Sequence, residues 1–235
     1  VVDLAVGAAL PRLIAGGANS TVWVLRLAAD GSVKAPQRID RAAGGLPAGT
    51  LDGFFNFGMA VTALGDLDGD GIGDLATSAL EVGGSGGTNS RLGAVFELFL
   101  AADGTVREHR LVRVPRALLN EGDDVGAGLA ALGDLDGDGV VDLLAGAPGD
   151  DDGPGVGSDN RGAAWVLFLN ANGTLKSVQK ISATQGGFTG LPPQRAEFGD
   201  AVAALGDVDG DGVGDVAVGA SSEDDGGIDR GAVYL

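Results

Sequence analysis

Cysteine is absent from this chain of 235 residues, and histidine, methionine and tyrosine each occur only once. The absence of cysteine excludes disulfide bonds and thiolate metal sites, but it leaves the redox compartment open. Positive charge is also scarce, because 15 lysines and arginines stand against 33 aspartates and glutamates, for a formal net charge of -18. Such a chain repels phosphate backbones and anionic lipid headgroups, so nucleic acids are poor partners and cations are the natural complement.

Long apolar runs are missing as well. No segment approaches the roughly 18 consecutive apolar residues that a membrane-spanning helix needs, so we expect no membrane insertion. The chain starts at Val1 without a methionine or a leader segment, and we expect a mature product or a portion of a longer protein. With 44% hydrophobic residues it is long enough to bury a substantial core, and its 44 glycines fall between alternating apolar runs, as turn residues do.

One internal repeat organises the sequence. The string GDLDGDG begins at Gly65 and Gly133, and GDVDGDG begins at Gly206. Each string leads into an aspartate and an apolar run, then into a polar loop and a second, alternating strand. A two-residue turn that tolerates positive φ predicts a hairpin to a fourth strand at three places, Asp30-Gly31, Asp103-Gly104 and Asn172-Gly173.

The repeat predicts an all-β fold, a β-propeller of four-stranded antiparallel blades, present as a partial propeller of about 3.5 blades. Small, uncharged first strands suit the crowded axis, and charge and Pro36 mark the fourth strands as outer edges. A helical array is disfavoured because glycine interrupts every candidate helix. Both chain ends supply strands 2 and 3, so we predict an open arc made of 1–40 (strands 2–4), the blades 54–115 and 125–182, and 197–235 (strands 1–3).

The nine-residue pattern D-x-D-G-D-G-x-x-D predicts metal binding. Its four carboxylates repel one another unless a cation lies between them, and its glycines permit the sharp turn that lets them converge. Position 7 has no side-chain ligand and, by analogy with the EF-hand loop, offers its backbone carbonyl. We predict about three Ca²⁺ sites, with the ligands Asp66, Asp68, Asp70, Ile72 and Asp74; Asp134, Asp136, Asp138, Val140 and Asp142; and Asp207, Asp209, Asp211, Val213 and Asp215.

Calcium is favoured over other ions because the ligands are all oxygen and flexible, whereas zinc and copper prefer softer donors and magnesium demands strict octahedral geometry. A true EF-hand needs Glu at position 12, where Thr77, Ala145 and Val218 stand. The alternative, acidic surface turns that bind nothing, is disfavoured by three copies that keep every carboxylate. Asp3 matches position 9 of a fourth loop whose other ligands are absent, so we expect no complete site there.

Phe57-Gly58 and Phe198-Gly199 before first strands, the acidic loop, and Gly146-Ala147-Pro148 after a second strand resemble the FG-GAP repeats of integrin α-subunit propellers and their bacterial relatives. Val125-Gly126 departs from the Phe-Gly pattern. The resemblance implies a seven-bladed propeller with calcium in the loops that join strands 1 and 2. It also implies that partners bind the opposite face, which is formed here by 41–57, 81–92, 148–161, 182–198 and 221–230.

Several polar residues outside the loops have two interpretations. Arg91, Arg161 and Arg230 recur just before the third strands, and we expect them to pair with neighbouring acids and not to contact a ligand. The acid clusters 150–152 and 223–225 are either solvated runs or a second, weaker cation site. Trp23 and Trp165 occupy equivalent third-strand positions, which favours core packing between blades over a sugar-binding platform.

Three functional classes follow. We favour an extracellular or cell-surface binding and adhesion module for a protein or glycan ligand, with the remaining blades supplied by further chain or by a second molecule. A structural subunit of a surface array or filament is the alternative. A glycan-active propeller enzyme is less favoured: His109, the single histidine, lies on a charged outer strand, and there is no cysteine and no nucleophile elbow. We therefore predict no catalytic residues.

Overall fold

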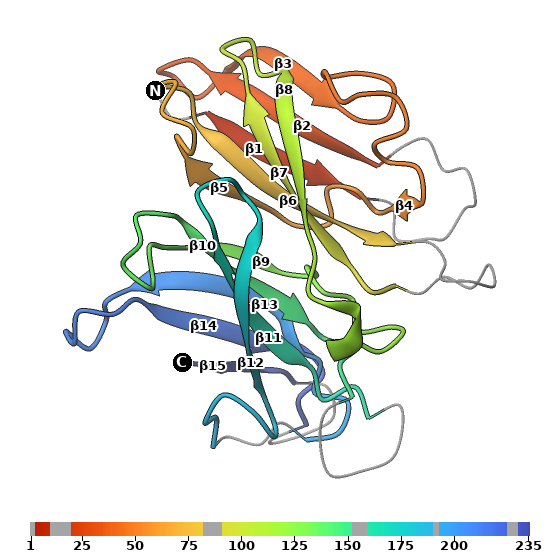
Figure 1. Cartoon of the computed structure of the whole chain (residues 1–235), viewed down its shortest axis with the longest axis vertical. Coiled ribbons are helices and arrows are strands. Elements are labelled where there is room, and N and C mark those ends of the chain that lie inside the picture. Colours follow the sequence, from red (N-terminus) through yellow and green to blue (C-terminus); the bar gives the residue numbers. More distant parts are fainter. Residues whose placement is uncertain (1–2, 10–19, 82–90, 152–158, 190–192, 225–229) are drawn as a thin grey trace.

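The computed structural model describes residues 3–9, 20–81, 91–151, 159–189, 193–224 and 230–235. These residues form four antiparallel sheets that follow one another in chain order (Figure 1). The first sheet contains β1 (Leu4–Ala8), β2 (Thr21–Leu27) and β3 (Val33–Ile39). The second contains β4 (Phe54–Phe55), β5 (Val61–Gly65), β6 (Asp74–Glu81), β7 (Ala94–Leu100) and β8 (Val106–Val112).

The third sheet contains β9 (Leu129–Gly133), β10 (Asp142–Ala147), β11 (Ala163–Leu169) and β12 (Leu175–Ser182), and the fourth contains β13 (Phe198–Gly206), β14 (Asp215–Ala220) and β15 (Ala232–Tyr234). The described residues contain a single helical turn, the 3₁₀ segment η1 (Arg116–Leu118), and none of their helices is long and apolar enough to cross a membrane. The predicted all-β partial propeller is confirmed.

The sheets are stacked, so each inner sheet is covered on both faces. Every residue of β7 is buried, whereas the outer strand β8 is buried only at its two ends, Val106 and Val112. The near-continuous apolar third strands follow from this double covering. Three hydrophobic clusters fill the junctions between consecutive sheets, and they centre on Phe96, Trp165 and Phe198 respectively. The core is therefore divided among the junctions between sheets.

The first and last sheets lie at opposite ends of the described structure (Figure 1). The inner strands β5, β9 and β13 lie next to one another. No described strand of the first sheet pairs with a strand of the last, so the described chain forms an open arc. One short strand was not expected: β4 pairs with the end of β6, and its Phe54 ring packs edge-on against Phe96 at 5.0 Å.

Glycines bring consecutive sheets into close backbone contact. In the first sheet Gly7 lies four positions after Asp3, and in the third sheet Gly146 lies four positions after the equivalent Asp142. A Cβ added at Gly7 would overlap the carbonyl oxygen of Gly58, and one added at Gly146 would overlap that of Gly199. Gly58 and Gly199 are the glycines of the Phe-Gly elements in the next sheets. Gly199 also needs its positive φ of 99°. The Phe-Gly and Gly-Ala-Pro elements are therefore the two halves of one inter-sheet contact.

The second sheet makes the same contact with a different residue. Ser78 stands where the first and third sheets have glycine, and its hydroxyl donates a 2.6 Å hydrogen bond to the carbonyl oxygen of Gly126. The same hydroxyl oxygen accepts a hydrogen bond from the Ala60 amide at 3.1 Å. A small polar side chain is tolerated here because both of its hydrogen-bonding roles are satisfied.

We predict that Gly146→Ala lowers the free energy of unfolding by at least about 2 kcal/mol, because the new methyl group forces two backbones apart. Gly219→Ala is the matched control, since Gly219 holds the same position in the last sheet and a Cβ there would meet its nearest neighbours at 3.5 Å. The control is expected to change stability by less than about 0.5 kcal/mol. Equal losses in urea unfolding would contradict this account of the contact.

Candidate metal loops

The three acidic loops connect β5 to β6, β9 to β10 and β13 to β14, and all lie on the left-hand side of the molecule in Figure 1. The short β5–β6 connection turns on Gly69 and Gly71, whose φ angles are 77° and 87°. Residues with a Cβ rarely adopt such angles, so glycine is needed for the turn. The other two loops repeat this backbone conformation at the matching glycines.

The three loops share one hydrogen-bond pattern. In the first, Asp66 Oδ2 accepts the Gly71 N–H at 2.8 Å, and Asp70 Oδ1 accepts the Ile72 N–H at 2.8 Å. The equivalent bonds in the other loops measure between 2.8 and 3.0 Å. Backbone N–H groups thus fix the first and fifth positions, so the loops are shaped by their own hydrogen bonds.

The ninth-position aspartates of the first two loops join the loop to a third strand. Asp74 accepts the N–H of Leu67 and the N–H of Leu100, both at 3.0 Å. Asp142 repeats the arrangement with Leu135 at 3.1 Å and Leu169 at 3.0 Å. Burial raises the pKa of both carboxyls, and these backbone hydrogen bonds oppose the shift. Sequence reasoning assigned these residues only as ligands and missed this structural role.

Carboxylate oxygens converge in each loop. Three acids per loop have ligand atoms within 4.8 Å of one another: Asp66, Asp68 and Asp70; Asp134, Asp136 and Asp142; and Asp207, Asp209 and Asp215. Oxygens that lie about 2.3 to 2.6 Å from one calcium ion are separated by distances of this order, so the donor set fits that ion. The structure does not bring the fourth acid of each loop, or the carbonyls of Ile72, Val140 and Val213, into these groups, and their ligand roles stay predictions.

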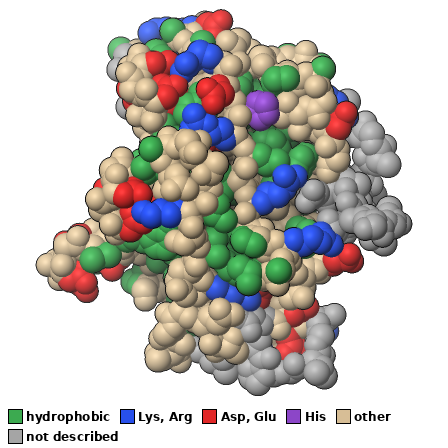
Figure 2. All heavy atoms as spheres, viewed as in Figure 1, with side chains coloured by type: hydrophobic (Ala, Val, Ile, Leu, Met, Phe, Trp, Pro, Cys, Tyr) green, Lys and Arg blue, Asp and Glu red, His purple; other side chains and the backbone are tan. Residues whose placement is uncertain are grey.

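Two basic side chains reach the first two loops from the outer strands. Arg107 of β8 pairs through Nη2 with Asp68 and, at 2.9 Å, with Asp70. Lys176 of β12 pairs with Asp136 at 2.8 Å and with Asp138 at 2.6 Å. The Lys176 hydrogen bond lowers the pKa of Asp138. In Figure 2, basic and acidic side chains lie side by side along this part of the surface. Sequence analysis missed both contacts.

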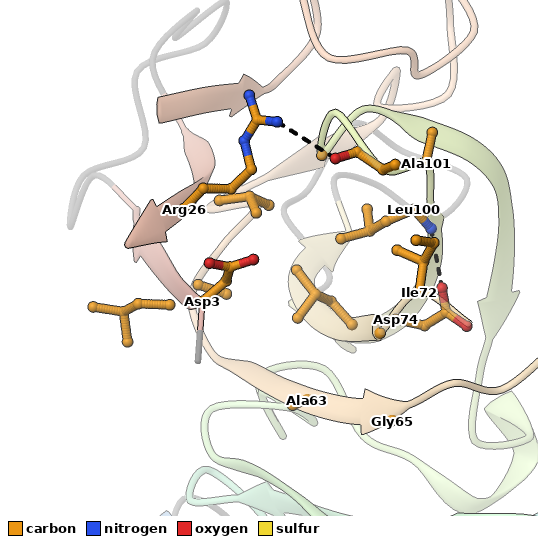
Figure 3. A pocket seen from close by; sticks show the side chains of 15 residues that line it. Asp3, Arg26, Ala63, Gly65, Ile72, Asp74, Leu100 and Ala101 are labelled. Carbon is orange, nitrogen blue, oxygen red and sulfur yellow. Dashed lines mark hydrogen bonds between the residues drawn. The ribbon is translucent and has the colours of Figure 1, made fainter. Parts of the chain in front are cut away.

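A cavity of about 290 Å³ lies between the first two sheets, beside the β5–β6 loop (Figure 3). Asp3 and Arg26 line it from one side, and Asp74 lines it from the other. Arg26 is fixed by a 3.4 Å hydrogen bond to the carbonyl oxygen of Ala102, and Asp3 accepts the N–H of Leu27 at 3.1 Å. Asp3 therefore plays the part in its sheet that Asp74 plays in the second.

The comparison with protein families addresses the repeat directly. The sequence model of the FG-GAP repeat matches residues 125–167 and 198–235. The chain contains FG-GAP repeats. The resemblance inferred from the Phe-Gly elements and acidic loops is confirmed, and both matched segments include a complete acidic loop.

The FG-GAP chain is also similar to integrin α-subunits. It is 44% identical over 96 residues to integrin alpha pat-2 of Caenorhabditis briggsae, and 33% identical over 138 residues to integrin alpha-3 of Cricetulus griseus. It is 37% identical over 146 residues to integrin alpha-10 of Homo sapiens. These alignments cover 40%, 57% and 61% of the chain, but only 7%, 11% and 11% of the relatives. The chain therefore spans about a tenth of the length of these relatives.

The recurring arginines lie near the end of the sheets opposite the acidic loops. Arg91 pairs with Asp124 through both Nε, at 2.9 Å, and Nη2, which confirms the structural interpretation for this residue. Arg161 is buried with its Nε 3.7 Å from Asp159. Arg230 donates its backbone N–H to the carbonyl oxygen of Glu223 at 3.1 Å. The loop parts 82–90, 152–158, 190–192 and 225–229 lie outside the described residues.

The interpretation of the acid clusters as solvated runs is wrong for two of their members. Asp150 is fully buried and pairs with Lys180 of β12 at 2.8 Å, and its backbone carbonyl accepts the Gly162 N–H at 3.0 Å, so its own sheet holds it in place. Glu223 is buried and accepts a 2.7 Å hydrogen bond from the Tyr234 hydroxyl. Residues 152 and 225 lie outside the described part of the chain.

The tryptophans differ in environment. Trp165 is buried in the cluster between the second and third sheets, with the Lys180 ammonium 5.3 Å from its ring centroid. Trp23 is only partly buried. The prediction of core packing therefore holds for Trp165, and its cation neighbour belongs to the same buried ion pair as Asp150.

One buried glutamate is expected to make the stability of the fold depend on pH. Glu97 is fully buried on β7, at the position that Val24 and Val166 occupy in the third strands of the neighbouring sheets. Burial raises its pKa from 4.5 to about 7, with a partial opposing effect from Arg110. The unfolded chain therefore loses this proton at lower pH than the folded chain. The contribution of Glu97 to stability is therefore expected to fall as pH rises from 4.5 to 7 and to stay lower above 7, by about 3 kcal/mol.

We predict that Glu97→Val removes this pH dependence and raises stability most at pH 8. The measurement is urea unfolding of wild type and variant at pH 5 and pH 8. Other titrating groups are common to both proteins, so the difference between the two pH profiles isolates Glu97. Parallel profiles would show that the glutamate carries no pH-dependent penalty.

Proposed function

We propose that each acidic loop binds one calcium ion and that the chain acts as an extracellular binding or adhesion module for a protein or glycan ligand. The observation that carries this proposal is the convergence of three carboxylates within 4.8 Å in each of three loops. Hard oxygen donors in this number are the ligand set that calcium takes. In this proposal the four aspartates of each loop and the carbonyl of position 7 are the ligands, and water completes the shell.

Calcium has a mechanical role in this proposal. The loops follow directly after strands β5, β9 and β13, which line the inner side of the stacked sheets. An ion bridging positions 1, 3 and 5 to the ninth-position aspartate would join two strands of one sheet and stiffen the scaffold. Long connections at the other end of a rigid scaffold are where recognition is usually placed. Similarity to integrin α-subunits supports a protein ligand and a surface location.

The end sheets favour further blades beside this chain. Val233 and Leu235 of the last sheet are 70% and 92% exposed, and Leu4 of the first sheet is 49% exposed. Apolar faces of this kind are covered in a stacked propeller. We propose that further chain or a second molecule covers them, with the blade units 1–40, 54–115, 125–182 and 197–235 as the building blocks. A surface array assembled through these faces is the second candidate.

An enzyme is not favoured by the geometry of the cavity. Asp74 lines it and has a raised pKa, as a general acid would. Both of its oxygens, however, accept backbone N–H groups, which favour the ionised carboxylate over the protonated form that a general acid needs. We propose a binding role without catalytic residues.

Calcium is expected to stabilise the protein measurably. If the sites bind near 10⁻⁴ M, as many extracellular modules do, about 1 mM calcium adds roughly 1.4 kcal/mol per site and about 4 kcal/mol in total. Thermal unfolding of metal-free protein, with and without calcium, checks this. Magnesium at the same concentration is the control and should add far less. An unchanged melting temperature would contradict calcium binding.

Substitution of single ligands separates metal binding from folding. Asp209→Asn should lower stability in calcium but leave it unchanged or higher in chelator, because it relieves repulsion among the loop carboxylates. Asp215→Ala is the comparison: it removes the acceptor of the Val208 N–H, 2.7 Å away, and should cost stability under both conditions. Asp209→Asn losses of equal size with and without calcium would mean that Asp209 is a folding residue and not a ligand.

Ligand recognition is tested separately with glycan arrays and pull-down experiments in calcium and in chelator. A calcium-stiffened scaffold should lose binding in chelator, and Asp209→Asn should weaken binding in part. Capture that persists unchanged without calcium would show that the metal has no role in recognition.

A further inference from the structure

A basic residue recurs at one register position of the outer strands. In each of the first three sheets, the last residue of the third strand pairs with a residue of the outer strand; these pairs are Leu27–Val33, Leu100–Val106 and Leu169–Leu175. The next residue of the outer strand is the basic one: Lys34, Arg107 or Lys176. This position lies just beyond the hairpin turn, at the same end of the sheet as the acidic loop. Two of the three basic residues have a complete loop in this chain, and both reach it.

The basic groups contact the oxygens that the backbone leaves free. Asp70 uses Oδ1 to accept the Ile72 N–H and Oδ2 to pair with Arg107. Asp138 divides its oxygens in the same way between the Val140 N–H and Lys176. A guanidinium in one loop and an ammonium in the other therefore bridge the third- and fifth-position carboxylates. The contact depends on position and charge and not on one side-chain shape.

The last loop lacks this cation. Among the residues that the structure describes, no lysine or arginine pairs with Asp209 or Asp211, whereas Asp68 and Asp136 each have such a partner. In Figure 2 the left-most projection, which is the β13–β14 loop of Figure 1, carries acidic side chains without a basic one beside them in this view. The described part of the chain thus shows two loops with a basic partner and one loop without it.

We propose that Arg107 and Lys176 are tethered cations that hold their loops in the binding shape without metal and compete with calcium for the third- and fifth-position carboxylates. Like charges in a compact loop repel, and a nearby cation offsets that repulsion. The side chains are 47% and 38% exposed, so each can swing into solvent when its carboxylates take a metal ion. The two cations thus lower the affinity of their loops for calcium, and they keep the loops in the binding shape when no metal is bound.

This inference rests on the proposed calcium binding, so its test reads each loop separately. The amides of Gly71, Gly139 and Gly212 each donate to the first aspartate of their own loop, and they serve as reporters in ¹H–¹⁵N spectra. Calcium is titrated into metal-free wild type, Arg107→Gln and Lys176→Gln. We expect Arg107→Gln to tighten binding at Gly71 alone, and Lys176→Gln at Gly139 alone, by roughly two- to tenfold.

Two further variants separate the contact from general charge. Arg107→Lys keeps a cation within reach and should leave the Gly71 midpoint near that of the wild type. Lys34→Gln removes one positive charge at the matched register, where this chain has no complete loop, and should shift none of the three midpoints. In chelator, Arg107→Gln and Lys176→Gln should lower the melting temperature, whereas Lys34→Gln should not.

The outcomes separate the two proposals. Calcium binding by the wild type with unshifted or weakened midpoints in Arg107→Gln and Lys176→Gln would overturn the tethered-cation inference and leave calcium binding intact. No response of any glycine amide in any variant would contradict calcium binding itself, and with it this inference. A metal-free melting temperature unaffected by both substitutions would overturn the claim that the cations hold the loops.

Discussion

The close approach of consecutive sheets is the constraint on which the rest of this structure depends. At Gly7–Gly58 and Gly146–Gly199 two backbones meet with no space for a Cβ, and at Ser78–Gly126 a hydroxyl bridges the same gap. Because the backbones meet, the side chains on both faces of each inner sheet are buried, which explains the wholly buried strand β7. The spacing between sheets also lines up the strand ends from which the acidic loops project.

The acidic loops combine two opposing requirements. The proposed calcium binding requires a loop compact enough for several carboxylates to face one ion, and the loop must also keep its shape when no ion is bound. Backbone N–H groups meet the second requirement by donating hydrogen bonds to the first and fifth aspartates, and in the first loop the ninth aspartate accepts an N–H of the third strand. The carboxylate oxygens left over are the ones that meet Arg107 and Lys176. The loops are thus shaped by the fold before any metal contributes.

Charged side chains outside the acidic loops differ in whether they have a partner of opposite charge. Asp150 pairs with Lys180 beside Trp165, and Asp124 pairs with Arg91, so these charges have opposite charges beside them at the base of the connections. Glu97 lacks an equivalent: its two oxygens are buried without a hydrogen-bond partner, which is the physical cause of its raised pKa. Of the described charges, those of the acidic loops remain the best suited to binding.

The repeat, the strand order within a sheet, the hairpin turns and the acidic loops could all be predicted from sequence, because each depends on residues close together in the chain. The Asp-Gly turns and the nine-residue loop are examples, since their hydrogen bonds join residues only a few positions apart. The contacts of Arg107 and Lys176 join residues 37 to 40 positions apart, Asp150 pairs with Lys180 of a different strand, and Glu97 lies on a strand that is buried throughout. Such contacts depend on how the sheets stack, so only the tertiary structure decided which charges face solvent, which face a loop and which are buried.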